Sequence, residues 1–482
     1  MRVEIGRLRT AIALFEASEW ADTAIKVEIP VGNYRPIITD RHVDSQALQQ
    51  NTADGSATRP VRSASMRKRN LTLGSVFVVV AALLFWGVGS YWARVPSLTS
   101  GPPIKLTIEE FDGDALGKEL SNLVQDSFSN NSIVALQATS LPDATEGNFI
   151  VSGTVTKRDE RSFVRVNLTE QASQKLVWSH YFELDTSTDL RTQLNANLNG
   201  ELETRLLGEA KSRLEKMDIA LLGPEKLFIL GTWVSGPAKS TLSWETERVT
   251  LMQLALEKDP DFGPAHSVLA DKYGFLANVH PDWNTEEYLT LSRFHAERAI
   301  ELPPLDANAM FNVAQSYWHA GRHSASQRMF LRVTELDQSN SLAHFFAKLL
   351  PYWCADVPND VMLWATDFDA SLSRDDPIRW IVLTWIAQLH TNRGEYDLAA
   401  RSITDAAQIF QVAYTYMSHA MLLVKTGQPG LARSIVQRQN LNWPNAGFEH
   451  YINTTVPRLC LERPNAERFT EDYQELLTAL RK

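Results

Sequence analysis

The chain has 482 residues, of which 44% are hydrophobic and 22% are charged, so it is long enough for several domains with buried cores. The formal net charge is −10. Residues 1–69 contain 11 Lys and Arg against 8 Asp and Glu, whereas the rest of the chain contains 36 against 49. This acidic bulk argues against nucleic-acid binding by the large C-terminal part. Nucleic acid remains a candidate partner only for the N-terminal segment.

Residues 1–41 contain two notable stretches, RVEIGRLRTAIALF and IKVEIPVGNYRPII. The first resembles the recognition helix of winged-helix transcription factors of the response-regulator type, and the second resembles the wing hairpin that follows it. The resemblance implies that Arg2, Arg7 and Arg9 face DNA and that Arg35 lies in the wing. A complete winged helix has further elements ahead of this helix, so we expect a partial domain. A generic amphipathic helix followed by a hairpin is the alternative.

Residues 42–69 are rich in small and polar residues and end in a basic cluster, so they predict a flexible basic linker. Between Arg69 and Arg94 lie 24 residues without a charge. A helix of that length reaches about 36 Å, against a hydrocarbon core of about 30 Å. We therefore predict a single transmembrane helix over 70–94. A buried core helix and a signal peptide are the alternatives, and the length of the run favours an anchor.

The flanks of this run predict its orientation and its contacts with the membrane interface. Basic residues are concentrated before it and aromatic residues near its end. The positive side stays in the cytoplasm, so we expect a cytoplasmic N-terminus, a position in the cytoplasmic (inner) membrane, and a periplasmic C-terminal bulk. The predicted membrane-interface residues are Arg67, Lys68, Arg69, Trp86, Tyr91, Trp92 and Arg94.

Residues 104–214 follow a short linker over 95–103 and mix strand and helix patterns, which predicts an α+β domain. Three consecutive strand-like runs are separated by polar turns, as in an antiparallel meander. A helix closes the unit. The predicted strands cover 104–111, 132–139, 148–159, 162–171 and 176–185, and the predicted helices cover 114–129 and 190–214.

Residues 104–214 resemble the amino-terminal domain of TolB and FlgO, and the best match lies over 148–185. Those domains have a Gly-Ser/Thr-Val strand, a turn, an amphipathic strand and a Leu-Trp strand, and they often precede tetratricopeptide repeats in bacterial regulators. The first strand departs from the family, which usually ends it in Pro-Phe. This chain has Glu110-Phe111 there.

From residue 223 to 482 the strand signals vanish and helical motifs recur. Similar segments end helices at 255–261, 299–306 and 333–340, and similar turns occur at 319–330, 391–403 and 424–435. A period near 34 with small residues on the helices is typical of helical repeats. Gly394 and Gly427 fit the position after a helix end, which favours a positive φ.

This C-terminal pattern resembles tetratricopeptide repeats through Tyr317, Gly321, Ala325 and the acidic-Pro end at Asp259-Pro260. The resemblance implies five or six degenerate repeats over 225–460, with a concave surface for a protein or peptide partner. The segment 351–376 departs from the repeat. Together with the anchor and the N-terminal segment, the chain resembles membrane-anchored regulators of the CadC or ToxR kind.

Candidate chemical groups are few. His319 and His323 have i,i+4 spacing, but Gly321 lies between them in a predicted turn, so a shared metal is not expected. Asp375 and Asp376 before Pro377 predict a helix cap rather than a catalytic pair. No phosphate-binding glycine loop, nucleophile elbow or zinc-protease motif occurs in the sequence. We expect no catalytic, cofactor-binding or metal site. An enzyme with hydrolase activity in a groove is the least favoured alternative.

The tryptophans and cysteines have two interpretations each. Trp353, Trp364, Trp380 and Trp385 could line a ligand groove, but core positions are favoured in a helical array. Two separate core thiols are favoured for the two cysteines, Cys354 and Cys460. A disulfide in an oxidising compartment is the alternative.

Two functions remain as hypotheses. The first is a membrane-anchored interaction or signalling protein whose periplasmic repeats bind a protein or peptide partner. The second is a one-component transmembrane transcriptional regulator that contacts DNA through residues 1–41. The sequence does not fix the oligomeric state.

Overall fold

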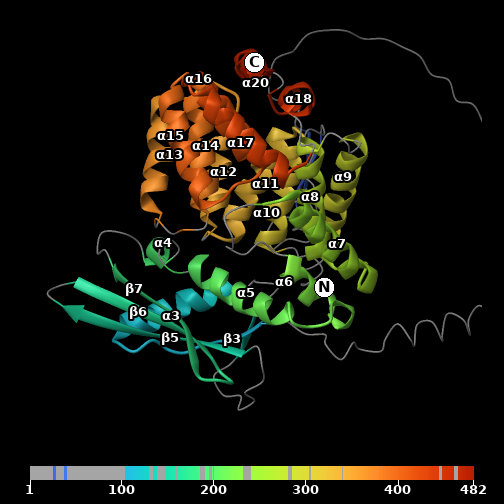
Figure 1. Cartoon of the computed structure of the whole chain (residues 1–482). Helices are drawn as coiled ribbons and strands as arrows, with labels where there is room; N and C mark the ends of the chain where they lie inside the picture. The colour runs from blue at the N-terminus through green and yellow to red at the C-terminus, as the bar shows by residue number, and fades with distance from the viewer. Residues whose placement is uncertain are drawn as a thin grey trace, which may run out of the picture. The chain divides into compact units, whose positions relative to one another are not determined.

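The computed structural model describes two short strands near the N-terminus and most of residues 104–481 (Figure 1). The two N-terminal strands belong to a small unit and residues 104–481 to a larger one, and each is described by itself. Within 104–481 the description omits residues 130–133, 138–147, 159–160, 185–189, 195–197, 199, 232–239, 281–284, 303–305, 339, 373, 375, 377, 445–447 and 461–464.

The predicted membrane helix over 70–94 and the linkers over 42–69 and 95–103 lie outside the described residues. Among the residues that are described, no helix combines the length and apolar character needed to cross a bilayer. The anchor therefore stays a prediction of the sequence.

Strands β1 (Ile25–Glu28) and β2 (Ile37–Asp40) form an antiparallel pair in which Ile25 lies opposite Asp40. They lie at the two ends of the stretch over 25–38 that was expected to form the wing hairpin. The hairpin is thus present, while its assignment to a winged helix stays a prediction.

The larger unit contains a five-stranded sheet in the order β4-β3-β5-β6-β7. Strand β3 is parallel to β4 and β5, whereas β5, β6 and β7 are successive antiparallel strands. The predicted meander is thereby confirmed. The bounds are β3 (Ile104–Ile108), β4 (Val134–Gln137), β5 (Asn148–Arg158), β6 (Arg161–Glu170) and β7 (Lys175–Leu184).

Alternation of side chains gives this sheet one buried face, since Val164, Val166 and Leu168 of β6 are fully buried. Helix α3 (Ala115–Phe128) begins at an Asp114 cap, whose carboxylate accepts the Leu116 N–H. Phe111 lies over a strand glycine, because a Cβ at Gly153 would come within 2.5 Å of its ring. This close approach explains why β5 carries glycine there.

The helix predicted over 190–214 corresponds to α4 (Leu190–Leu194) and α5 (Gly200–Leu214). Of the residues between them, only Leu198 lies within the described part of the chain, and it is helical. Helix α5 is tied to the sheet by the Trp178 Nε1–H, which donates to Glu201 at 2.9 Å.

The rest of the larger unit is a helical, repeat-like array, in agreement with the predicted all-α part (Figure 1). It begins with α6 (Pro224–Gly231) and continues through paired helices. These are α7 (Leu242–Lys258), α8 (Gly263–Val279), α9 (Thr285–Glu301), α10 (Ala307–His319), α11 (His323–Leu336), α12 (Ser341–Leu349), α13 (Asn359–Ser371), α14 (Arg379–Asn392), α15 (Tyr396–Ile409), α16 (Ala413–Lys425) and α17 (Pro429–Asn442).

Three helix pairs share the same turn, at Gly321, Gly394 and Gly427. Their φ values are 77°, 73° and 76°, so each glycine adopts the left-handed conformation expected after a helix end. In each turn the following N–H donates to the carbonyl five residues back. The donors Arg322, Glu395 and Gln428 pair with Tyr317, His390 and Leu423. The predicted repeat of this turn is confirmed.

The chain after α17 returns to the array. It forms α18 (Phe448–His450), the π-helical turn η5 (Tyr451–Thr455), α19 (Val456–Cys460) and α20 (Ala466–Arg481). Cys460 forms a disulfide with Cys354, and both are fully buried. The favoured expectation of two separate thiols is therefore wrong. The helical array brings together two cysteines 106 residues apart, which no local pattern signals.

The first and last helix pairs of the array are also joined. Trp443, which follows α17, is fully buried and its Nε1–H donates to the carbonyl of Ser240 at 3.0 Å. Ser240 precedes α7, and its own N–H donates to the Gln411 carbonyl at 2.7 Å. Residues far apart in the sequence thus close the array at its ends.

Candidate functional site

The inner helices of the array meet one another through aromatic side chains. Phe275 of α8 lies 5.4 Å from Tyr414 of α16, and Trp318 of α10 lies 5.8 Å from Trp385 of α14, measured between ring centroids. Every residue of α8 except Lys272 is buried, as expected for a helix surrounded by others. The inner face is therefore filled by the protein's own side chains.

The tryptophans that could have lined a groove belong largely to this core. Trp353 and Trp385 are buried and lie 4.6 Å apart. Trp364 and Trp380 are half-buried, and their rings contact Phe368 and Phe410. The prediction of core positions is confirmed for the first pair.

A buried ionic network lies on α8 and its neighbours. Asp271 accepts from Lys272 at 2.9 Å and lies 3.4 Å from the Nε2 of His319. Burial alone would raise the pKa of Asp271, but the Lys272 ammonium and the His319 contact outweigh it and hold that pKa below its usual range. Burial lowers the pKa of His319. On α7, Glu245 pairs with Arg248 at 3.2 Å.

Two buried histidines face each other between α8 and α9. The Nδ1 atoms of His266 and His295 are 2.8 Å apart, so one ring donates and the other accepts. Burial, followed by the neighbouring His266, lowers the pKa of His295 to about 4. Neither ring takes part in a metal cluster, since the described residues contain no group of three His, Cys, Asp or Glu placed to hold a metal ion.

The C-terminal segment is attached to α8 through Asn278. The Asn278 amide donates to the backbone carbonyls of Gly274 and His319 at 3.0 and 3.1 Å. Its side-chain oxygen accepts from Arg458 of α19, and its backbone carbonyl accepts from the Thr455 hydroxyl at 2.7 Å. These bonds position Arg458 over the turn between α10 and α11.

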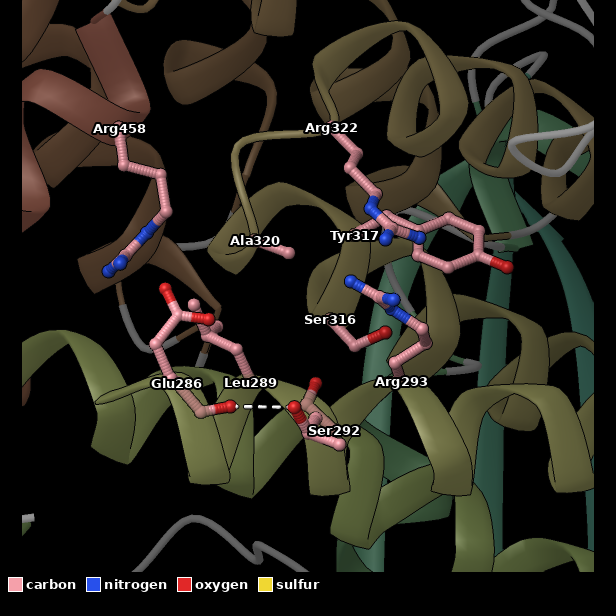
Figure 2. Close-up of a pocket in the computed structure, with 10 residues that line it drawn as sticks. Glu286, Leu289, Ser292, Arg293, Ser316, Tyr317, Ala320, Arg322 and Arg458 are labelled. Carbon is pink, nitrogen blue, oxygen red and sulfur yellow. Dashed lines mark hydrogen bonds between the residues drawn. The ribbon is translucent and has the colours of Figure 1, made fainter. Parts of the chain in front are cut away.

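A cavity of about 240 Å³ opens beside that turn (Figure 2). Helix α9 contributes Glu286 and Arg293, the α10–α11 turn contributes Arg322, and α19 contributes Arg458. Figure 2 shows Arg458 on one side of the cavity, with Arg293 and Arg322 on the other. Three arginines and one glutamate give this lining a formal charge of +2. We call these four residues the arginine pocket.

The backbone turn sets the width of the arginine pocket. A Cβ atom at Gly321 would come within 2.7 Å of the Arg458 carbonyl oxygen, so α19 can approach only because residue 321 is glycine. Burial lowers the pKa of Arg458, while the charge of Glu286 opposes that shift. The guanidinium remains charged at neutral pH.

The structure separates some residues that the sequence placed together. His319 ends α10 and His323 begins α11. The Gly321 turn lies between them, so the two histidines do not share a helix face, as predicted. Asp376 accepts the Ile378 N–H at 2.9 Å, but the N-cap of α14 is Ile378 and carries no side-chain cap, so the predicted helix cap is not formed by Asp376. Asp375 and Pro377 lie outside the described residues.

The residues predicted to contact DNA or the membrane interface also lie outside the described residues. They are Arg2, Arg7, Arg9, Arg35, Arg67, Lys68, Arg69, Trp86, Tyr91, Trp92 and Arg94. Their assigned roles stay predictions.

Comparison with known proteins identifies neither a matching family model nor a matching curated sequence. The functional argument therefore depends on the geometry of the chain itself.

Sequence reasoning did not identify the arginine pocket. Its arginines come from three separate segments, and none belongs to a basic run or a spaced motif. The one local signal was Gly321, which was interpreted only as a turn of the helical repeat.

Proposed function

We propose that this is a membrane-anchored interaction or signalling protein whose periplasmic helical array binds a protein or peptide partner. The observation that carries the proposal is the stack of helix pairs with a recurring glycine turn. Such arrays offer extended surfaces to partners. A tetratricopeptide-like repeat is supported by buried Tyr317, the turn at Gly321 and buried Ala325. Because the inner face is filled, the outer helices of the array are the surface proposed for the partner.

The disulfide supports the proposed compartment. A disulfide between Cys354 and Cys460 persists in an oxidising environment such as a periplasm and is rare in the cytoplasm. The basic residues ahead of the apolar run imply the same orientation.

Topology is tested by introducing a cysteine at Ser63 or at Ser179 and labelling intact cells with a membrane-impermeant maleimide. Labelling at position 179 alone is the expected result. Labelling at position 63 alone would contradict the proposed orientation. The native cysteines should not contribute, since both are buried in a disulfide.

Partner binding is tested by placing a photo-crosslinking amino acid in the full-length protein in its native membrane. Leu331 on α11 and Leu363 on α13 are 48% and 62% exposed and report on the array, while Leu176 on β7 is 56% exposed and serves as the matched control. A discrete adduct from the array positions but not from Leu176 is expected. Adducts from the control position alone would place the partner surface elsewhere.

We propose a transmembrane transcriptional regulator as the second candidate function, which the β1–β2 hairpin favours. The test is a gel shift with full-length protein in detergent. DNA binding through phosphate contacts should weaken with salt, with a slope of about 0.9 per contact. Replacing Arg2, Arg7, Arg9 or Arg35 by alanine should reduce that slope. A salt-independent shift, or none, would count against DNA binding.

A further inference from the structure

We propose that the arginine pocket binds a small soluble molecule carrying a carboxylate or phosphate group. The inference goes beyond the proposed function, since such a ligand could occupy the pocket whether or not a partner protein binds the array. Figure 2 shows the side chains that would surround it.

The charge and shape of the lining favour an oxyanion. Arg293, Arg322 and Arg458 contribute guanidinium groups to the lining, and arginine is the side chain that most often binds carboxylate and phosphate groups. Glu286 is the one acidic residue among the lining residues, and it is exposed. Its carboxylate forms no ion pair with the described basic groups, so the positive charge is not neutralised from within.

Arginines elsewhere in the array are paired differently. Arg248, Arg379 and Arg393 each lie within 2.8–3.2 Å of a carboxylate oxygen. By contrast, Arg293 and Arg458 have no carboxylate within ion-pair distance among the described residues. Arg458 donates to the neutral Asn278 side chain instead. Two of the guanidinium groups that line the arginine pocket thus lack an anionic partner within the described part of the chain.

The size of the cavity limits the ligand. A volume of about 240 Å³ is below the range of roughly 300–1,000 Å³ typical of drug-sized ligands. It suits a short dicarboxylate or a phosphate better than a folded segment of a partner. The source we assign is therefore a free small molecule, and an acidic side chain of a partner is the competing outcome.

The test measures binding to the full-length protein in detergent by isothermal titration calorimetry. The probes are inorganic phosphate, succinate and an acidic hexaglutamate peptide, with chloride at matched ionic strength as the blank. Saturable binding of phosphate or succinate is expected. Saturation by hexaglutamate alone, or by none of the three probes, would overturn the assignment.

Variants locate the site. Arg293→Gln, on an exposed side chain, and Arg458→Gln should each weaken binding by about tenfold or more, as expected for a charged hydrogen bond. Glu286→Gln should tighten binding by removing repulsion. Arg401→Gln on α15 changes an exposed arginine outside the pocket and should have no effect. If Arg401→Gln weakens binding as much as Arg293→Gln does, the binding is non-specific and the proposal fails.

Discussion

Gly321 lies directly against the backbone of Arg458, so that a Cβ atom there would meet the Arg458 carbonyl oxygen at 2.7 Å and its Cγ at 2.9 Å. The contact joins the turn between α10 and α11 to helix α19. The equivalent glycines at 394 and 427 have nothing within 4 Å of the same position. The three turns therefore share one backbone geometry but differ in what surrounds the glycine. Comparing them separates the free energy cost of the left-handed conformation from the cost of steric overlap with α19.

Replacing each of these glycines by alanine should give unequal losses of stability. Gly394→Ala and Gly427→Ala should cost about 1–2 kcal/mol through the left-handed conformation. Gly321→Ala should cost about 2–5 kcal/mol because steric overlap is added. Urea unfolding of the three variants measures the difference. Equal losses would show that α19 moves aside without cost.

Removing the disulfide should destabilise the array. The bond closes a loop of 106 residues, and cross-links of this size contribute about 2–5 kcal/mol. The double variant Cys354→Ala with Cys460→Ala should unfold at lower urea than the oxidised protein, and the reduced native protein should behave like the variant. A thiol count in denaturant, with and without reductant, verifies the bond. Equal midpoints for all three forms would contradict its stabilising role.

Stability should rise with pH between about 4 and 6.5. Folded His295 has its pKa lowered from 6.5 to about 4, so in this interval the unfolded chain binds a proton that the folded chain does not. Stability therefore falls as pH falls through this window, by at most about 3 kcal/mol from this group.

The variant His295→Gln isolates that contribution, since an amide can hydrogen-bond to His266 without titrating. Urea unfolding across the same pH interval should give a shallower dependence for the variant. Burial also lowers the pKa of His419 to about 4, so some dependence should remain. An unchanged slope would mean that His295 is protonated normally in the folded protein.

Trp443 should be among the most sensitive core positions. It is fully buried, and Trp443→Ala should cost about 3–5 kcal/mol. Trp443→Phe retains an aromatic ring but leaves the Ser240 carbonyl without its donor. This change should lower the free energy of unfolding by about 1–3 kcal/mol. Half-buried Trp364 is the matched control, where the change to Phe should cost less. Thermal unfolding ranks the variants, and a larger loss for Trp364→Phe would contradict the role of the Ser240 bond.

Local patterns predicted most of the fold. Alternating apolar residues located β5, β6 and β7, and the repeated glycine turns located the helix pairs.

The contacts between distant segments were not predictable in the same way. Cys354 and Cys460, Ser240 and Trp443, and the arginine pocket each depend on how many helix pairs lie between the partners and how each pair is rotated. The rotations of successive helix pairs add up along the array, and a short window of sequence contains no pattern that reports their sum. The same summed rotations bring Phe275 and Tyr414 together, so the filling of the inner face was not predictable from local patterns either.

The hydrogen bond between Trp443 and Ser240 limits which insertions and deletions this chain can accept. In an open stack each unit contacts only its neighbours, so units can be gained or lost at little cost. Here the two ends recognise each other, and inserting or deleting one helix pair would separate them. The number of units is therefore fixed by closure, and variation should be confined to surface loops and to the exposed faces of individual helices.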